Sequence, residues 1–219
     1  MSLLAAVPVK DLVNAKQRLI PFLSARERRE LAAAMLEDVL AALISALPGS
    51  VAVVTADADV MELARRRGAD CVVERANRGH TEAVALAQQS ARAGGLDGFL
   101  TIPGDAPCVT AEEVSRLVAA LANQAGAAFV PSLSGFGTNA ALLVPPDCMP
   151  LKFGEPSFEN HLDTARERGL NPVVLRLPGV GLDIDSAEDL RLLLAGGTPT
   201  RSAALLRAWD IPTRLARRS

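Results

Sequence analysis

The sequence predicts an α/β fold with a mostly parallel sheet and helices on both of its faces. Two observations support this prediction. Short apolar runs alternate with longer amphipathic stretches along the whole chain, and a repeated strand, helix, strand order builds a parallel sheet because each parallel crossover needs a helix. The chain also has 219 residues, of which 49% are hydrophobic, enough for a core of its own. We therefore expect a single domain with a Rossmann-like order of elements.

Six apolar runs are the expected strands. In chain order they are LLAAVPV, VAVVT, ADCVVE, GFLTIPG, AAFVPS and NAALLVP. Continuous apolar runs of this length are typical of strands that are buried on both faces of a sheet. In an open parallel sheet, ligands bind beyond the carboxyl ends of the strands. The residues that follow each run are therefore the candidates for function.

Three capping boxes mark the starts of expected helices. In each box a hydroxyl and an acidic side chain three residues later satisfy the free amides of the first helical turn. The longest helix is expected over residues 26–47, and a shorter one begins after Asp57 and ends near residue 67. The three boxes are Ser24 with Glu27, Thr110 with Glu113, and Ser186 with Asp189.

The overall charge and composition argue against several classes of partner. The 23 basic and 25 acidic side chains give a net charge of -2, which provides no general attraction for nucleic acid or an anionic membrane. The start MSLLAAVPVK lacks the pattern of a signal peptide. The cysteines, Cys71, Cys108 and Cys148, lack the spacing of zinc or dithiol sites. We expect a cytoplasmic protein with reduced thiols.

The segment VPVKDLVNAKQRL follows the first expected strand. It contains neither the glycine pattern of a dinucleotide-binding fold nor that of a P-loop. It does contain three cations, Lys10, Lys16 and Arg18. Placed at a strand end, these side chains could neutralise a triphosphate, and the arginine offers a planar fork to phosphate oxygens. The alternative interpretation is a solvated basic loop.

Acidic side chains in two segments suggest a divalent metal site. Asp105 follows the run GFLTIPG, and Asp183 and Asp185 stand one residue apart near the start of a helix. If the segment around them is extended, Leu182 and Ile184 face the core and both aspartates face the cleft. Carboxylates at neighbouring strand ends suit Mg²⁺. Two alternatives remain, because Asp105 could stabilise a turn and Asp185 could cap the helix.

Glycines and short hydrogen-bond donors suggest an anion site. One set lies at the start of the sixth expected strand and the other opens the next helix, where backbone amides and the helix dipole both favour an anion. The first set is Gly135, Gly137, Thr138 and Asn139, and the second is Gly154, Ser157 and His161. The alternatives are a tight turn, an ordinary serine cap and a partly buried surface histidine.

Six motifs in order resemble one known family. They are V-P-V-K with A-K-x-R-L, the helix AMLEDVLAAL, D-x-P after the fourth strand, G-x-G-T-N-A-x-L-L, F-G-x-x-S-F-x-x-H and L-D-I-D-S-x-E-D-L. Together they run from about Val7 to Leu193. In this set and order the sequence resembles the 2-phospho-L-lactate guanylyltransferase family.

The resemblance implies a fold, a reaction and partners. The fold is that of a nucleotidyltransferase of the nucleotide-diphospho-sugar transferase type, over residues 1–195, and we expect a C-terminal helix and basic tail over residues 196–219. The reaction transfers GMP from GTP to 2-phospho-L-lactate, phosphoenolpyruvate or 3-phosphoglycerate, with release of pyrophosphate, in the biosynthesis of coenzyme F420. The partners to consider besides these substrates are a second copy of the chain and the next enzyme of the pathway.

The resemblance also implies roles for individual residues. The catalytic residues would be Lys10, Lys16 and Asp105. Mg²⁺ would be held by Asp105, Asp183 and Asp185. The nucleotide would be bound by Pro8, Lys10, Lys16, Arg18, Glu74, Gly79 and Asp105, and the phosphoacid by Thr138, Asn139, Gly154 and Ser157. His161 would at most contact the substrate, because an ionised phosphate needs no general base.

The sequence departs from the family pattern at one element of the nucleotide pocket. Where the family shows G-L-N-x-A, this chain has Gly79, His80, Thr81, Glu82 and Ala83. Guanine recognition needs hydrogen-bond acceptors, which a glutamate at position 74 or 82 could supply. The departure keeps open the alternative of a nucleotidyltransferase for another nucleotide or phosphorylated substrate, of the molybdopterin or sugar-phosphate type. An alternative from a different class is a non-catalytic, nucleotide-binding regulatory module, and the presence of Asp105, Asp183 and Asp185 together argues against it.

Overall fold

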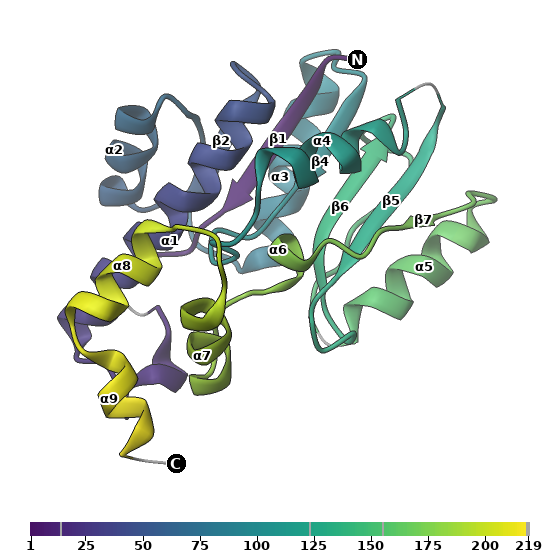
Figure 1. Ribbon diagram of the computed structural model, residues 1–219. Helices are drawn as coiled ribbons and strands as arrows, with labels where there is room; N and C mark the ends of the chain where they lie inside the picture. The colour runs from purple at the N-terminus through teal and green to yellow at the C-terminus, as the bar shows by residue number, and fades with distance from the viewer. Residues whose placement is uncertain (14, 123, 155, 218–219) are drawn as a thin grey trace.

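The computed structural model describes residues 1–13, 15–122, 124–154 and 156–217. These residues form one seven-stranded sheet with the strand order β3-β2-β1-β4-β6-β5-β7 (Figure 1). The strands are β1 (Leu3–Pro8), β2 (Val51–Thr55), β3 (Asp70–Val73), β4 (Gly98–Thr101), β5 (Gly126–Pro131), β6 (Thr138–Val144) and β7 (Val173–Val174). All six expected strands are present. Strand β7 is an addition, since two residues are too few to leave a pattern in the sequence.

Most neighbouring strands are parallel, as predicted. The exception is β6, which runs antiparallel to both β4 and β5. Thr101 near the end of β4 pairs with Ala141 of β6, so the first residues of β6 lie at the edge of the sheet where β1 and β4 end. This reversal brings Thr138 and Asn139 to the same edge as the residues that follow β1 and β4.

Helices cover both faces of the sheet, which confirms the predicted layers (Figure 1). On one face, α1 (Ala25–Ala46), α2 (Ala58–Arg67), α4 (Ala111–Ala119) and α6 (Pro178–Gly181) contribute to one apolar core. On the other face, α3 (His80–Ala93) and α5 (Ser157–Glu167) pack over a second core. Among the described residues, no helix is both long and apolar enough to span a membrane.

The chain after the sheet forms a third apolar cluster beside the first half of α1. Its helices are α7 (Ala187–Ala195), α8 (Arg201–Ala208) and α9 (Ile211–Ala216), and the 3-10 helix η1 (Gln17–Leu19) joins them. Leu206, Ile211 and Leu215 are buried there against Leu31 and Met35 of α1. The segment after residue 195 thus contains two short helices and contributes to the core, while residues 218–219 of the expected tail lie outside the described ranges.

The expected helix starts are confirmed in detail. The boxes at Ser24, Thr110 and Ser186 each form both reciprocal hydrogen bonds. Asp57 accepts from two amides at the start of α2, which ends at Gly68 with φ of 84°, a left-handed conformation that glycine adopts without strain. The cap of α7 is Ser186, so the alternative in which Asp185 caps this helix is wrong.

The segment 182–185 does not belong to the sheet, so Asp183 and Asp185 do not stand at a strand end, which corrects the expectation of carboxylates at neighbouring strand ends. Leu182 and Ile184 are buried in the third cluster, and Asp183 and Asp185 face the cleft, so the predicted alternation of faces is confirmed. One backbone hydrogen bond, from Ile184 N–H to Asp105 C=O at 3.0 Å, ties the segment to the turn after β4. The segment is thus held by apolar packing in the third cluster and not by pairing with a neighbouring strand.

Candidate functional site

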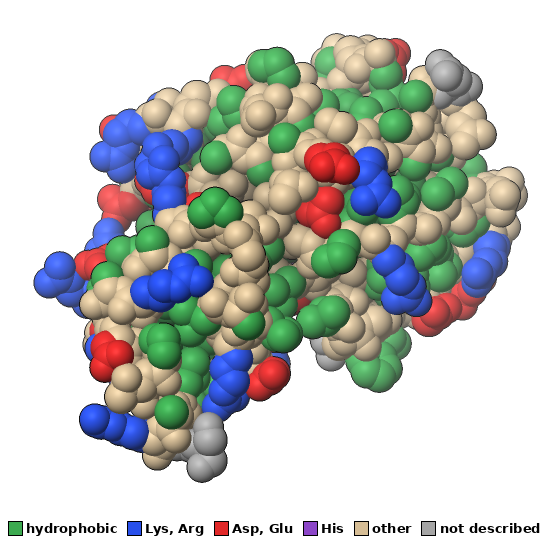
Figure 2. All heavy atoms as spheres, viewed as in Figure 1, with side chains coloured by type: hydrophobic (Ala, Val, Ile, Leu, Met, Phe, Trp, Pro, Cys, Tyr) green, Lys and Arg blue, Asp and Glu red, His purple; other side chains and the backbone are tan. Residues whose placement is uncertain are grey.

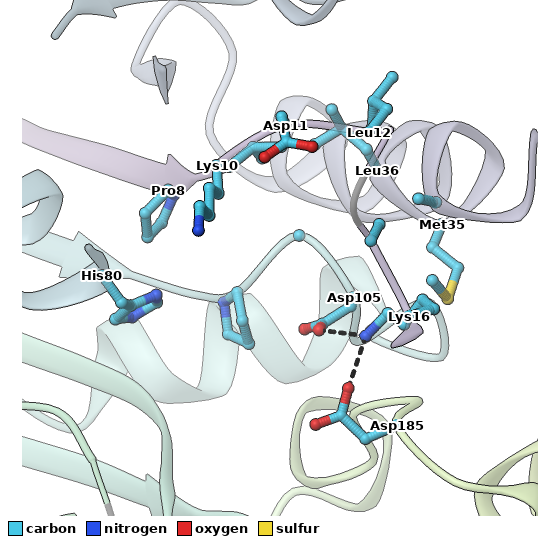
Figure 3. A pocket seen from close by; sticks show the side chains of 15 residues that line it. Pro8, Lys10, Asp11, Leu12, Lys16, Met35, Leu36, His80, Asp105 and Asp185 are labelled. Atoms are coloured by element: carbon cyan, nitrogen blue, oxygen red, sulfur yellow. Dashed lines mark hydrogen bonds and ion pairs between the residues drawn. The ribbon is translucent and has the colours of Figure 1, made fainter. Parts of the chain in front are cut away.

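Two cavities adjoin at the carboxyl ends of β1 and β4. We call the first, of about 310 Å³, the lysine cavity because Lys10 and Lys16 line it (Figure 3). The second, of about 510 Å³, we call the hydroxyl cavity because Ser132, Thr138 and Ser157 line it. The two cavities share four lining residues, so they form one cleft. The shared residues are His80, Pro103, Asp105 and Asp185.

Lys16 provides the cation that separates two of the cleft's carboxylates. Its Nζ lies 2.5 Å from Asp105 Oδ2 and 2.8 Å from Asp185 Oδ1 (Figure 3). Burial would lower the pKa of Lys16, but the two aspartates outweigh it and hold the pKa above its ordinary value. The backbone of Lys16 has φ of 56°, a strained conformation for a residue other than glycine that is common where function fixes a side chain. Lys16 is therefore charged and held in place.

Asp183 is the third carboxylate of the cleft, and Asn139 orients it. Asn139 Nδ2 lies 3.0 Å from Asp183 Oδ1 and equally close to the carbonyl oxygens of Val180 and Gly181. Burial raises the pKa of Asp183, and the negative charges of Asp105 and Asp185 raise it further, against the lowering effect of Asn139. The amide of Asn139 is thus engaged with the chain itself, although the side chain also lines the hydroxyl cavity.

The donor set of these aspartates fits a hard cation that is shared with a ligand. Carboxylate oxygens are the protein ligands that Mg²⁺ prefers, and it is usually held by one or two of them together with water and substrate phosphates. Burial is the main cause of the raised pKa of Asp183, and the negative charges of Asp105 and Asp185, which a cation besides Lys16 would offset, add to it. Within the described ranges, no group of three or more His, Cys, Asp or Glu side chains is arranged to hold a metal alone. The fit is therefore to a shared site, not to a complete protein cage.

The predicted cations lie on different sides of the cleft. Pro8, the last residue of β1, and Lys10, just after the strand, line the lysine cavity (Figure 3). Arg18 is exposed and lines the hydroxyl cavity instead. Burial alone would raise the pKa of Asp185, but Lys16 and Arg18 lower it below its ordinary value. The arginine thus lines the same cavity as the residues expected for the phosphoacid, whereas Lys10 lines the other cavity.

Two residues expected at the nucleotide line neither cavity. Glu74 directly follows β3 and is buried, which raises the pKa of its carboxyl group. Gly79 precedes α3 with φ of 102°, a conformation that favours glycine. Its N–H donates to Asn77 Oδ1 at 3.2 Å. The structure therefore gives Gly79 a role in starting α3 and leaves both residues outside the cleft.

The residues predicted for the phosphoacid are brought together. Thr138, Gly154 and Ser157 all line the hydroxyl cavity. Ser157 begins α5, and its Oγ accepts from the N–H of Thr138 at 3.0 Å. Gly154 has φ of 120° and no atom within 4 Å of where a Cβ would stand, so its backbone is open on that side. Residues from β6, the following loop and α5 thus meet in one wall.

Some residues of the cleft were not predicted. His80, at the start of α3, lines both cavities and packs its ring edge against Phe153 at 4.5 Å between centroids. Thr101 lines the hydroxyl cavity, and its buried Oγ1 has no hydrogen-bond partner among the described residues. The sequence carried a signal for His80, since it departs from the family pattern there. It carried none for Thr101, which reads only as part of a buried strand.

His161 is placed differently from both interpretations of the sequence. The residue is 2% exposed and is not part of the lining of either cavity, so the interpretation as a partly buried surface residue is wrong. Its Nδ1 lies 2.9 Å from Thr138 Oγ1. Burial lowers its pKa to about 4. His161 is therefore a neutral ring behind the wall of the hydroxyl cavity.

Charged side chains outside the cleft produce little net electrostatic field that could steer a charged ligand toward it. On the face in Figure 2, basic and acidic side chains lie mixed over the surface. Many pair with each other, such as Arg67 with Glu37 at 2.6 Å and Arg29 with Asp59 at 2.5 Å. Exposed pairs of opposite sign cancel at a distance. An anionic ligand must therefore be drawn by the cations of the cleft itself.

Comparison with known proteins gives a family and relatives over nearly the full chain. A family described as guanylyl transferase CofC like matches residues 3–219. Phosphoenolpyruvate guanylyltransferase of Sphaerobacter thermophilus is 40% identical over 93% of this chain and 98% of its own. 2-phospho-L-lactate guanylyltransferase of Methanothermobacter thermautotrophicus is 36% identical over 94% and 91%. 3-phospho-D-glycerate guanylyltransferase of Colwellia psychrerythraea is 32% identical over 88% and 91%.

A solved structure supports the fold. The chain matches a protein of Desulfovibrio desulfuricans G20 that is assigned to the nucleotide-diphospho-sugar transferases, with a TM-score of 0.80 and 20% sequence identity. The match covers 99% of this chain and 98% of the other. The predicted fold type is confirmed.

Proposed function

The chain belongs to the family of CofC-like guanylyl transferases, and from this premise we infer that it transfers GMP from GTP to a three-carbon phosphoacid in coenzyme F420 biosynthesis. Pyrophosphate is the second product. Three phosphoacids are candidates, because the relatives are named for phosphoenolpyruvate, 2-phospho-L-lactate and 3-phospho-D-glycerate.

One observation of the structure carries the proposal, namely that a cavity lined by Lys10 and Lys16, together with three aspartates, adjoins a cavity rich in hydroxyl groups. The GTP phosphates would lie in the lysine cavity beside Lys10 and Lys16, and the phosphoacid in the hydroxyl cavity beside Thr138, Gly154 and Ser157. The border between the cavities is then the place where the two substrates meet. Asp105 lines both sides of that border.

The reaction needs positioning and charge neutralisation more than it needs an acid or base. A phosphate oxygen of the phosphoacid attacks the α-phosphorus of GTP, and the bond to pyrophosphate breaks. A phosphate monoester has its second pKa at about 6, so the attacking oxygen carries charge without a general base. Lys16, held charged by Asp105 and Asp185, and the exposed Lys10 offset the negative charge that gathers on the phosphates. No covalent intermediate is required.

We also propose that the reaction depends on Mg²⁺, with Asp105, Asp183 and Asp185 as the residues that would hold it. When bound, the ion would supply further neutralisation of the phosphate charge. The support is that Asp105 and Asp185 line the border of the two cavities and that Asp183 lines the adjoining hydroxyl cavity. A readout besides activity is calorimetric titration of Mg²⁺ in the presence of GTP. The heat in excess of that from Mg²⁺ titrated into GTP alone should be lost in Asp183→Asn and kept in the surface control Asp163→Asn.

The proposed function is tested by pyrophosphate release from a matrix of substrates. Each of GTP, ATP, CTP and UTP is mixed with Mg²⁺, the protein and each of the three phosphoacids, with protein and nucleotide at equal concentration so that an unstable product does not mask one turnover. We expect release with GTP and at least one phosphoacid, and none when the phosphoacid is omitted. Release with ATP, CTP or UTP but not with GTP would instead favour a nucleotidyltransferase for another nucleotide, the alternative that the departure at His80 and Thr81 keeps open.

A homodimer and a complex with the next enzyme of the pathway are further proposals. Neither follows from a contact in the structure, and their support is the resemblance of the sequence alone. Sedimentation of the purified chain, alone and with the enzyme that consumes the guanylylated product, measures both. A monomer in both runs would rule out these partners at the concentrations used.

A further inference from the structure

The two ring nitrogens of His161 have unlike partners. Nε2 lies 3.0 Å from the backbone nitrogen of Lys152, and Nδ1 lies 2.9 Å from Thr138 Oγ1. The ring stacks on Phe129 with 5.5 Å between centroids and an interplanar angle of 6°, and Phe153 meets it edge-on at 5.1 Å. Packing on both sides therefore fixes the plane of the imidazole.

The backbone of Lys152 determines where the imidazole proton lies. A backbone N–H can only donate, so Nε2 of His161 must accept. In a neutral imidazole one nitrogen accepts and the other donates, and therefore Nδ1 carries the proton and donates it to Thr138 Oγ1. Burial supports the neutral form, since it lowers the pKa of His161 to about 4.

This direction of donation frees the hydroxyl proton of Thr138. Its Oγ1 accepts from His161 Nδ1 and from the hydroxyl of Ser157 at 3.3 Å. Ser157 Oγ in turn accepts from the N–H of Thr138 at 3.0 Å. With both acceptor positions of Thr138 Oγ1 used, its own proton has no partner inside the network. Thr138 lines the hydroxyl cavity, so that proton is available there.

We propose that His161 is a positioning residue, whose Nδ1–H makes Thr138 present its hydroxyl proton to an oxygen of the phosphoacid. With the opposite tautomer, Thr138 would donate to the imidazole and turn a lone pair toward the cavity, which repels a phosphate or carboxylate. The inference rests on the proposed function for the identity of the anion. It adds a residue that contacts no substrate and nonetheless sets the polarity of the binding wall.

The first test observes the tautomer and needs no activity. Long-range ¹H–¹⁵N correlation spectra of protein labelled in histidine distinguish Nδ1–H from Nε2–H rings. The chain has 2 histidines, so a spectrum of His161→Asn assigns the signals. We expect His161 as the Nδ1–H tautomer at pH 7. An Nε2–H ring would overturn the proposal whether or not the protein proves to be a guanylyltransferase.

The second test uses two substitutions that each keep one polar position of the ring. Asparagine can place its amide N–H near the position of Nδ1, whereas glutamine reaches the position of Nε2 and leaves Thr138 without a donor. We expect His161→Gln to raise the KM for the phosphoacid about tenfold, the usual cost of one hydrogen bond to a charged group. In His161→Asn we expect a phosphoacid KM close to that of the unchanged protein. The KM for GTP should change in neither variant.

The control variant is Thr138→Val, which keeps the shape of the side chain and removes its hydroxyl. If His161 acts through that hydroxyl, His161→Gln should change the phosphoacid KM only when Thr138 is present and have no further effect in the double variant. A merely structural histidine would instead change both KM values, or add its effect to that of Thr138→Val. Either result would overturn the proposal. Calorimetric binding of phosphoenolpyruvate gives the same comparison if turnover is absent.

Discussion

Lys16 determines the charge balance of the cleft at the scale of single residues. Its side chain is 7% exposed, whereas those of Asp105 and Asp185 are 32% and 47% exposed. Solvent therefore reaches the carboxylates but not the ammonium group. Removing the lysine leaves two adjacent negative charges that water screens only in part. The prediction that basic residues follow β1 was right, but their carboxylate partners lie 89 and 169 residues away, beyond any local pattern.

We predict that Lys16→Met lowers the free energy of unfolding by roughly 1–2 kcal/mol, discounted for the exposure of both carboxylates. Excess Mg²⁺ should restore part of this loss if the aspartates hold a divalent ion. Urea denaturation with and without MgCl₂ measures both effects. The matched variant is Lys10→Met, at an exposed position, where we expect a change below about 0.5 kcal/mol. Equal stability of the two variants would contradict the assigned role of Lys16.

His161 should make stability depend on pH in a defined window. Burial lowers its pKa from 6.5 to about 4, so the unfolded chain binds a proton at a higher pH than the folded protein does. The contribution of this ring to the free energy of unfolding is fully present above pH 6.5 and is lost as pH falls through about 4. We expect a loss of about 2 kcal/mol between pH 7 and pH 4.5.

Urea denaturation at the two pH values measures this loss. Burial also lowers the pKa of His80, and its contribution has the same sign. Glu27, whose pKa is about 2 through the hydrogen bond from Arg214, changes only at lower pH. The control is therefore His161→Asn, which should show a smaller difference between pH 7 and pH 4.5. An unchanged difference would show that the ring does not titrate as described.

At the scale of elements, the start of α7 fixes one wall of the cleft. Asp189 Oδ2 accepts from the N–H of Asp185 at 3.0 Å and from the N–H and hydroxyl of Ser186, each at 2.7 Å. The capping box therefore also restrains the backbone that carries Asp185. The cap is local and was predicted from its spacing. The restraint on the backbone of Asp185 was not predicted, because its importance depends on the pairing of Asp185 with Lys16.

We predict that Asp189→Ala costs about 1–2 kcal/mol of stability and also reduces turnover, because Asp185 loses its backbone restraint. The control is Thr110→Ala, which removes the capping hydroxyl at the start of α4. Thr110 lines neither the lysine cavity nor the hydroxyl cavity. The substitution should cost about 1 kcal/mol and leave turnover unchanged. Thermal unfolding and initial rates of both variants make the comparison. Equal turnover in the two would mean that the α7 cap is only structural.

The segment 182–185 shows why some elements could not be predicted exactly. Its alternating pattern correctly placed Leu182 and Ile184 inward and the aspartates outward. The same pattern fits a strand or an extended segment packed on helices. Only the tertiary cluster with α7, α8 and α9 decides between them. The strands predicted from short apolar runs were less ambiguous, and all six were found, although β3 at the edge of the sheet is partly exposed and not buried on both faces.

At the scale of the whole molecule, the C-terminal helices support the side of the cleft that holds the lysine cavity. Asp38 of α1 accepts from Arg201 N–H at 2.8 Å and from Ser202 N–H at 3.0 Å, which caps α8. Arg214 of α9 lies 2.8 Å from Glu27 of α1. The same cluster buries Met35, which also lines the lysine cavity. The third cluster and the cleft thus share α1.

We predict that a chain ending at residue 195 does not fold stably. Truncation exposes the face of α1 that Leu206, Ile211 and Leu215 cover, and burying such side chains contributes about 1.5–3 kcal/mol each, a large share of a typical stability. Circular dichroism with a thermal scan measures the outcome. The control is the full chain with Leu206→Ala, which should remain folded with a lower melting temperature. A cooperative transition of the truncated chain near that of the full chain would show that residues 1–195 are an independent domain.

The central claim is that a phosphoacid bound beside Thr138 attacks the α-phosphorus of GTP bound beside Lys16. Single-turnover reactions with GTP labelled with ³²P at either the α or the γ position test it most directly. We predict that the α label appears in a guanylylated phosphoacid and the γ label in pyrophosphate, in equal amounts and only when both substrates are present. The γ label in inorganic phosphate or in the phosphoacid, with no transfer of the α label, would contradict the account.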